Sequence, residues 1–276
     1  MKTILLAAAA VSTLAFAGSA SAQSSDWTGV YVGVSAGYAD RSESKGETIG
    51  FDTNLDGIYG DTVRTAAGAD AFSTGFCGGS NITNAAPGGC RGDDKSDLEI
   101  SVRGGYDYQI GQFVVGGLVE YSQLQLQDAV TAFSTTPAAY TFTRKLNDMW
   151  AVRARGGYAF GNSLVYATAG YAVGNMKHSF ITTNTVNAFP RRGGGDAKGY
   201  QLGVGFEHKL TDNISLGGEW LRTSLEDDDY RVRAANSGTT AATNPFLLVN
   251  TQGTDFLRTD DDFEFNSFRV TLNYRF

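Results

Sequence analysis

The final eleven residues, 266–276, constrain the fold more than any other stretch of the chain. Apolar side chains occupy every second position of this stretch: Phe268, Val270, Leu272, Tyr274 and Phe276. In an extended strand alternate side chains lie on opposite faces, so the stretch predicts a strand with one apolar and one polar face. A strand of about ten residues with its apolar face outward and aromatic residues at its end is typical of a transmembrane β-barrel.

Seven further stretches show similar alternation, at 27–39, 97–108, 113–123, 148–160, 163–174, 197–210 and 214–224. Short connections alternate with four long polar loops, expected at about 40–96, 127–146, 175–195 and 225–262. An even number of strands with alternating short and long connections follows the rules of outer-membrane barrels. We therefore predict an all-β fold, an eight-stranded antiparallel up-and-down transmembrane barrel with short periplasmic turns and four long extracellular loops. The alternative is a secreted β-sandwich, which does not need this alternation of connections.

Both ends of the predicted barrel resemble known proteins. The final stretch is similar to the C-terminal signature of bacterial outer-membrane proteins, in which a last Phe, here Phe276, closes a strand of alternating apolar residues. The segment from Trp27 to Gly33 resembles the opening strand of the small outer-membrane β-barrel family typified by the major outer-membrane proteins of alphaproteobacteria. The resemblance implies a location in the cell outer membrane and a C-terminal strand that the barrel-assembly machinery recognises.

The N-terminus predicts export. Lys2 is followed by an apolar run over 4–17 and by the small residues Ala20-Ser21-Ala22, which together form a secretory signal peptide. We expect cleavage after Ala22, so that residues 1–22 are removed and residues 23–276 form the barrel. No later run approaches the roughly 20 apolar residues of a spanning helix. The net charge of −7, with no basic stripe along the chain, argues against a nucleic-acid partner.

The two cysteines, Cys77 and Cys90, lie in a Gly-rich part of the first predicted loop. An even number of cysteines in an exported chain favours a disulfide, which here would close a short loop. Two free thiols are the alternative.

Strand parity places ten charged side chains in the interior of the barrel. The acidic ones are Glu99, Glu120, Glu207 and Glu219. The basic ones are Arg103, Arg153, Arg155, Lys209, Arg269 and Arg275. Side chains fill the interior of an eight-stranded barrel, and unpaired buried charges are costly, so a salt-bridged plug is expected. The alternative is a narrow conduit for ions or small solutes, which the porins of the similar family suggest.

Three loop motifs suggest binding sites. Residues 52–57 match the first half of a Ca²⁺ loop, but the twelfth position is Val63 where a bidentate Glu is needed, so an Asx-rich turn is the simpler interpretation. Residues 91–93 form an Arg-Gly-Asp triplet that could bind a host receptor or arise by chance. Acidic runs at 226–229 and 260–262 predict a solvated collar, or divalent-cation bridges to lipopolysaccharide.

Catalysis has little support, because the chain contains only two histidines, His178 in a predicted loop and His208 at the opposite rim. We therefore expect no enzyme, no catalytic residues, no metal site and no cofactor. The similar family includes haem-binding members, which makes His178 the one loop histidine available to ligate iron.

The sequence thus predicts a structural outer-membrane barrel that displays four polar loops. A low-conductance porin is the first alternative, and a surface adhesin or haem receptor is the second. The expected partners are outer-membrane lipid and lipopolysaccharide, the assembly machinery, small solutes or a host surface. Because the loops are acidic, Gly-rich and low in apolar residues, we also expect them to be mobile in isolation.

Overall fold

The computed structural model describes residues 26–41, 46–92, 96–227 and 230–276. The predicted signal peptide, 1–22, and Asp93 of the Arg-Gly-Asp triplet lie outside the described residues. Within the described residues, no helix is long and apolar enough to cross a membrane.

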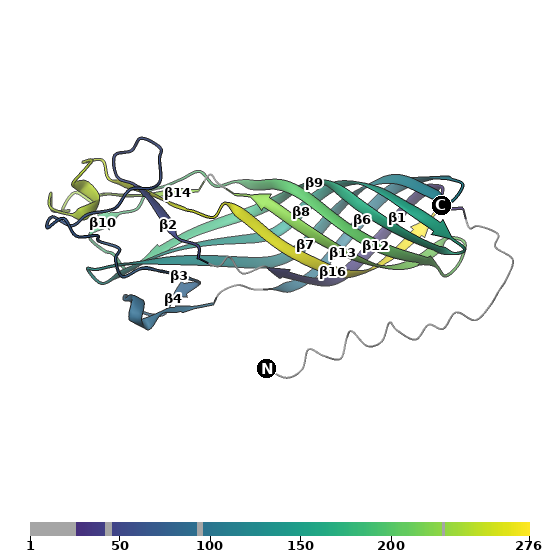
Figure 1. The fold of residues 1–276 in the computed structure, drawn as a ribbon, viewed down its shortest axis with the longest axis horizontal. Helices are drawn as coiled ribbons and strands as arrows, with labels where there is room; N and C mark the ends of the chain where they lie inside the picture. Colours follow the sequence, from purple (N-terminus) through teal and green to yellow (C-terminus); the bar gives the residue numbers. More distant parts are fainter. Residues whose placement is uncertain (1–25, 42–45, 93–95, 228–229) are drawn as a thin grey trace.

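Eight antiparallel strands form a closed ring (Figure 1). They are β1 (Gly29–Arg41), β6 (Asp97–Ile110), β7 (Phe113–Ser134), β8 (Ala138–Phe160), β9 (Ser163–Thr182), β12 (Asp196–Lys209), β13 (Ile214–Glu226) and β16 (Asp262–Arg275). Each strand pairs with its sequence neighbours, β1 pairs with β16, and β7 pairs with both β6 and β8, so the sheet has no free side edge. The predicted eight-stranded barrel is confirmed.

The turns at one end of the ring are tight. Gly161 begins the two-residue turn between β8 and β9. Its φ of 56° lies in the left-handed region, which glycine enters without the steric cost of a Cβ atom. Gly111 plays the same part between β6 and β7, with φ of 62°.

At the other end, three strands continue far beyond the predicted barrel. The segment 127–146, predicted as the second loop, is almost entirely strand, because β7 runs to Ser134 and β8 starts at Ala138. The third predicted loop is likewise strand as far as Thr182, the end of β9. The two loop predictions are therefore wrong over these residues.

A change in the polarity of the strand faces explains this error. Just above Ser122 the inward side chains of β7 are apolar and the outward ones polar: Leu124 and Leu126 point in, and Gln123, Gln125 and Gln127 point out. The period of two persists, although the β7–β8 register shifts between Gln123 and Leu126. A strand predicted from its outward apolar residues therefore ends where this inversion begins.

The remaining elements complete a second folded region at this end (Figure 1). Strands β2 (Ile49–Asp52), β10 (Asn187–Ala188), β14 (Arg231–Asn236) and β15 (Thr254–Arg258) form a small sheet, and β11 (Arg191–Arg192) also pairs with β14. Near the disulfide lie β3 (Phe76–Gly78), β4 (Ser80–Asn81), β5 (Cys90–Arg91) and the 3₁₀ turn η1 (Ala86–Gly88), whereas η2 (Pro245–Leu247) precedes β15. We call these elements, together with the far ends of β7, β8 and β9, the extension.

Candidate functional site: the closed interior and the extension

The outer face of the ring carries an exposed apolar belt. The five alternating residues of the final strand, Phe268, Val270, Leu272, Tyr274 and Phe276, all lie on it and are 46% to 73% exposed. Aromatic rings gather at both borders of the belt: Tyr121 and Trp150 are 4.9 Å apart between centroids at one, and Tyr274 and Phe276 are 5.1 Å apart at the other. An apolar band between two aromatic girdles is the surface that a bilayer covers.

Inside the ring, three arginines and three glutamates form one network. Arg269 lies at the centre, with Nη2 2.7 Å from Glu120 Oε1 and 2.6 Å from Glu219 Oε2, and Nη1 2.9 Å from Glu99 Oε1. Arg103 and Arg153 each contact Glu120 and Glu219 at 2.9 to 3.2 Å. All six side chains are buried, and their charges balance. We call these six residues the central network.

A second ionic group lies nearer the tight turns. Arg155 pairs with Asp107 and, at 3.1 Å, with Glu207, and Arg275 reaches Asp107 at 2.7 Å. Lys209 donates to the carbonyl oxygen of Asp26 at 2.5 Å. The ten side chains predicted to face the interior are therefore all buried in it, in two groups. Asp107 was not among the predicted interior residues, although it has the same parity as Arg103 on β6.

An apolar layer lies between the central network and the extension. It consists of buried side chains from seven of the barrel strands, mainly large apolar ones: Ala39, Leu124, Leu126, Leu146, Met149, Ala151, Ala172, Met176, Ala197, Leu225, Phe263 and Phe265. We call this set the apolar layer. The interior is thus filled first by paired charges and then by hydrocarbon.

Above the apolar layer, Asp128 joins the barrel to the extension. Its carboxylate accepts ion pairs from Arg41 at 2.7 Å, Arg144 at 2.9 Å and Arg258 at 2.5 Å, and Arg258 also pairs with Glu47 at 2.5 Å. Burial alone would raise the pKa of Asp128, but the three guanidiniums hold it below its usual value. Burial raises the pKa of Glu47, although Arg258 opposes the shift. No pattern in the sequence indicates this group, because its members come from three different predicted loops.

Arg144 also ties the last loop to the barrel. Its Nη1 and Nη2 atoms donate to the backbone carbonyl oxygens of Asp260, Asp261 and Asp262 at 3.2, 3.3 and 2.7 Å. The three aspartate side chains form the one group in the described residues that could hold a metal ion, with ligand atoms within 4.8 Å of one another. Burial and the neighbouring carboxylates raise the pKa of Asp262.

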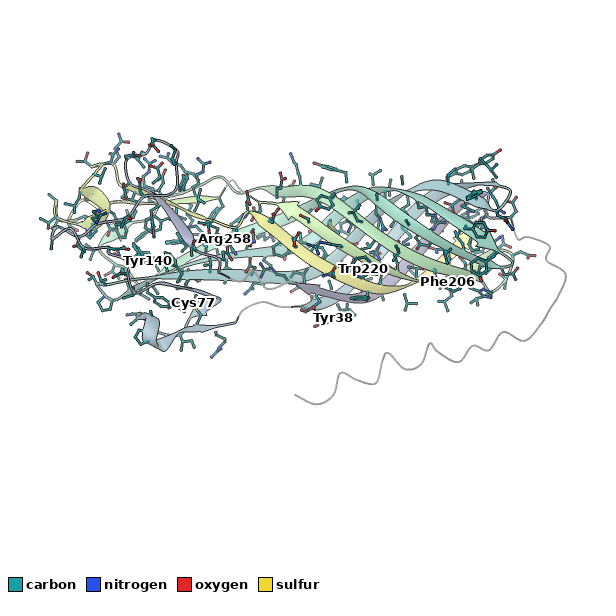
Figure 2. The ribbon with its side chains drawn as sticks, in the orientation of Figure 1. Tyr38, Cys77, Tyr140, Phe206, Trp220 and Arg258 are labelled. Atoms are coloured by element: carbon teal, nitrogen blue, oxygen red, sulfur yellow. A yellow bond between two sulfur atoms is a disulfide. The ribbon has the colours of Figure 1, made fainter. Side chains whose placement is uncertain are left out.

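The extension has an aromatic core of its own. Phe51 of β2 contacts Phe72 at 4.4 Å and Phe256 of β15 at 5.0 Å between ring centroids. Tyr140 of β8 stacks edge-on against Phe246 at 5.8 Å. Figure 2 shows Tyr140 and Arg258 in this region, away from Phe206 on the barrel. A few aromatic residues from distant loops thus meet in one core.

The predicted disulfide between Cys77 and Cys90 is confirmed. It links β3 to β5, and β3 pairs with β7. Cys77 is labelled in Figure 2. Thr131 of β7 donates to the carbonyl of Gly79 at 2.8 Å, and Thr141 of β8 donates to the side chain of Asn81 at 3.0 Å. The disulfide loop therefore covers the outward face of the extension strands.

The side chains of two other candidate sites are bonded to groups within the protein. The carboxylate of Asp52 accepts backbone N–H groups of Leu55, Asp56 and Gly57 at 2.6 to 3.2 Å, which is the Asx turn expected as the simpler interpretation. His178 lies on β9 rather than in a loop; its Nε2 is 2.7 Å from Asp227 Oδ1 and its ring stacks on Tyr230. His178 is thus buried and bonded, which does not suit an exposed haem ligand.

Comparison with known proteins identifies relatives over most of the chain. Residues 62–276 match the family model described as "Outer membrane protein beta-barrel domain". A 31 kDa outer-membrane immunogenic protein of Brucella melitensis is 26% identical over 252 residues, which cover 91% of this chain and 84% of that protein. A 22 kDa outer membrane protein of Rhizobium leguminosarum is 31% identical over 126 residues, 46% of this chain and 52% of that protein. Among solved structures, Ail of Yersinia pestis covers 90% of this chain and 99% of its own at 10% identity, but the TM-score of 0.35 supports no inference.

Proposed function

Because the chain belongs to the outer membrane protein β-barrel family, we propose that it is a closed outer-membrane anchor that displays a folded extracellular platform. Its location is the cell outer membrane, as in its named relatives. The apolar belt lies in the bilayer, and the extension projects from the side opposite the tight turns.

The filled interior is the observation that carries this proposal. The central network leaves no unpaired excess of charge to attract an ion, because its three arginines and three glutamates balance. Beyond the network, an ion would have to lose its water among the apolar side chains of the apolar layer, which is energetically costly; these include Leu126, Met149 and Phe265. Breaking a buried ion pair costs about 3–5 kcal/mol, so spontaneous opening of this interior is rare.

One observation favours a low-conductance porin as the second candidate. Buried polar atoms in and near the central network lack a hydrogen-bond partner among the described residues: Glu99 Oε2, Arg103 Nη1, Ser122 Oγ and Gln201 Oε1. Groups of this kind are commonly satisfied by water, so the interior has polar sites that a file of water molecules could link. The apolar layer separates these sites from the extension.

An adhesin or ligand receptor is the third candidate. The Brucella relative is named an immunogenic protein, which supports exposure of the platform to a host. Neither the family description nor the names of these two relatives refer to an enzyme. Binding that disappears when the platform is altered, with the barrel intact, would distinguish this candidate from a purely structural role.

Single-channel recording of residues 23–276 in a planar bilayer tests the proposal. Folding is first verified by the faster gel mobility of the unheated protein. We expect a silent bilayer from the wild type. Reproducible ion-selective steps that change in Arg153→Ala but not in Arg222→Ala, whose side chain lies outside and is 46% exposed, would overturn the closed anchor in favour of a porin.

A further inference from the structure

Two pairs of like charges face each other across neighbouring strands of the extension. Lys145 of β8 lies directly opposite Lys177 of β9. Arg192 of β11 lies directly opposite Arg231 of β14. Directly opposed residues share one face of a sheet, and like charges in this position destabilise it. The repulsion within the two pairs indicates that something outside the fold stabilises these four cations, particularly in a chain with a net charge of −7.

Among the residues that the structure describes, none forms an ion pair with these four cations. In the part of the chain that the structure describes, the ion pairs involve other arginines, such as Arg222 and Arg233. Lys145 Nζ donates to the neutral Gln125 side chain at 3.2 Å, and the Arg231 guanidinium lies over the Tyr59 ring at 5.5 Å. Lys177, Arg192 and Arg231 are exposed.

The two pairs form one strip along the outside of the extension. β12 pairs with β9 up to Asp196 opposite Asn175, and the preceding segment continues beside β9, where Arg191 Nη2 donates to the Phe180 carbonyl at 2.8 Å. β11 therefore follows β9, and β14 follows β11. We call Lys145, Lys177, Arg192 and Arg231 the basic strip.

The strip starts just above the aromatic girdle. On β8, Trp150 of the girdle is followed outward by Asp148 and then, past the register shift, by Lys145. Asp148 accepts a hydrogen bond at 3.3 Å from Asn175, the residue directly opposite on β9, so its carboxylate is bonded at that height rather than to the lysines above it. Lys145 and Lys177 thus lie at the height where lipid headgroups meet water, and the arginines lie further out.

We propose that the basic strip binds the phosphate groups of lipopolysaccharide in the outer leaflet. Lysine binds phosphate as a point charge and arginine binds it with a planar fork of N–H donors, so the two pairs can hold phosphates at two heights. A bound anion between two opposed cations removes their repulsion, which explains why the fold tolerates both pairs. This inference is independent of whether the barrel conducts.

The test uses the full mature barrel in phosphatidylcholine nanodiscs, titrated with purified rough lipopolysaccharide at low and at physiological salt. The variant Lys145→Gln/Lys177→Gln removes the lower pair, and Arg192→Gln/Arg231→Gln removes the upper one. Lys198→Gln is the matched control, because Lys198 is an exposed lysine of β12 that lies opposite an acidic residue, Glu226. Gel mobility and circular dichroism establish that each variant is folded.

We expect each double variant to weaken lipopolysaccharide binding about tenfold at low salt, and the control to bind as the wild type does. Unchanged binding by both folded double variants would overturn the proposal. Equal affinity of the wild type for a soluble polyanion such as inositol hexakisphosphate would overturn the lipid assignment and show a site for free polyanions instead.

Discussion

Arg269 of β16 reaches across the barrel interior to Glu120 of β7, with 2.7 Å between Nη2 and Oε1. The two residues lie 149 positions apart, and neither strand is the neighbour of the other in the ring. This contact therefore braces the barrel through its centre, independently of the hydrogen bonds that join adjacent strands.

Replacing Glu120 by Ala should destabilise the folded barrel by about 3–5 kcal/mol, because Arg103, Arg153 and Arg269 would lose a buried carboxylate. Urea unfolding in detergent micelles measures this change. Glu264→Ala is the matched control, since its pair with Arg222 is largely exposed and solvent screens it, so its loss should have little effect on stability. Equal losses in the two variants would contradict the bracing role.

The pH dependence of the extension follows from Asp128. Its folded pKa is below the unfolded value of 3.8, so its ion pairs stabilise the fold above pH 3.8 and are lost as the pH falls through the folded pKa. Glu47 has the opposite sign: its raised folded pKa favours the protonated form, so its contribution falls as the pH rises through that pKa. The exchange of β15 amides, relative to the intrinsic rate at the same pH, should therefore become faster below pH 3.8.

Asp128→Asn should give that fast exchange of β15 already at neutral pH, because a neutral amide cannot replace the charge shared by Arg41, Arg144 and Arg258. The strands inside the apolar belt should keep their protection. An acid response that persists unchanged in Asp128→Asn would assign it to other groups.

Gly37 makes room for the central network. A Cβ atom at this position would collide with the Phe268 carbonyl oxygen and with Cβ of Arg269. Gly37→Ala should therefore lower the yield of folded, heat-modifiable protein after refolding. Gly156→Ala should refold like the wild type, because a Cβ atom there meets nothing within 4 Å.

Breaking the disulfide should affect the extension and leave the barrel folded. Cys77 and Cys90 close a loop with a sequence separation of 13, for which the chain-entropy estimate is about 3 kcal/mol. Limited proteolysis with and without reductant should reveal new cleavage in this loop after reduction, with unchanged gel mobility of the barrel. Cys77→Ser/Cys90→Ser should be cleaved in the same way without reductant.

Phe276 should matter for assembly in cells more than for stability. Its side chain is 73% exposed on the belt, so Phe276→Ala removes little packing within the protein. We expect reduced insertion in cells but normal refolding of the purified variant into detergent. Phe206→Ala, which also lies on the belt and is 44% exposed, should insert normally if the terminal strand is the recognised element.

The sequence predicts the barrel well because lipid enforces one simple rule on it. Val270 and Leu272 must face out, and Arg269 and Thr271 must face in, so each strand inside the bilayer carries a visible period of two. The same rule located the ten interior charges. It could not supply their partners, because the pairing of Arg269 with Glu120 depends on how the ring closes.

The folded extension could not be predicted from the sequence, for two physical reasons. Water surrounds it, so Gln125 faces out and Leu126 faces in, which reverses the pattern used for the barrel. Its core is also built from single aromatic residues, such as Phe51 and Phe256, which lie far apart in the chain. The basic strip is likewise invisible as a stripe in the sequence, because Lys145, Lys177 and Arg192 come together only in the fold.

The uninterrupted course of β7 and β8 through the girdle has a mechanical consequence. Their pairing continues from Phe113 to Ser134 apart from one register shift, and the part beyond Gln123 adds roughly 35 Å of strand at 3.3 Å per residue. The extension is therefore a direct continuation of strands fixed in the membrane, rather than a separate cap tethered to the barrel. A pull on the tip would load many strand hydrogen bonds in shear at once, and whatever the tip presents is held at a constant height above the lipid.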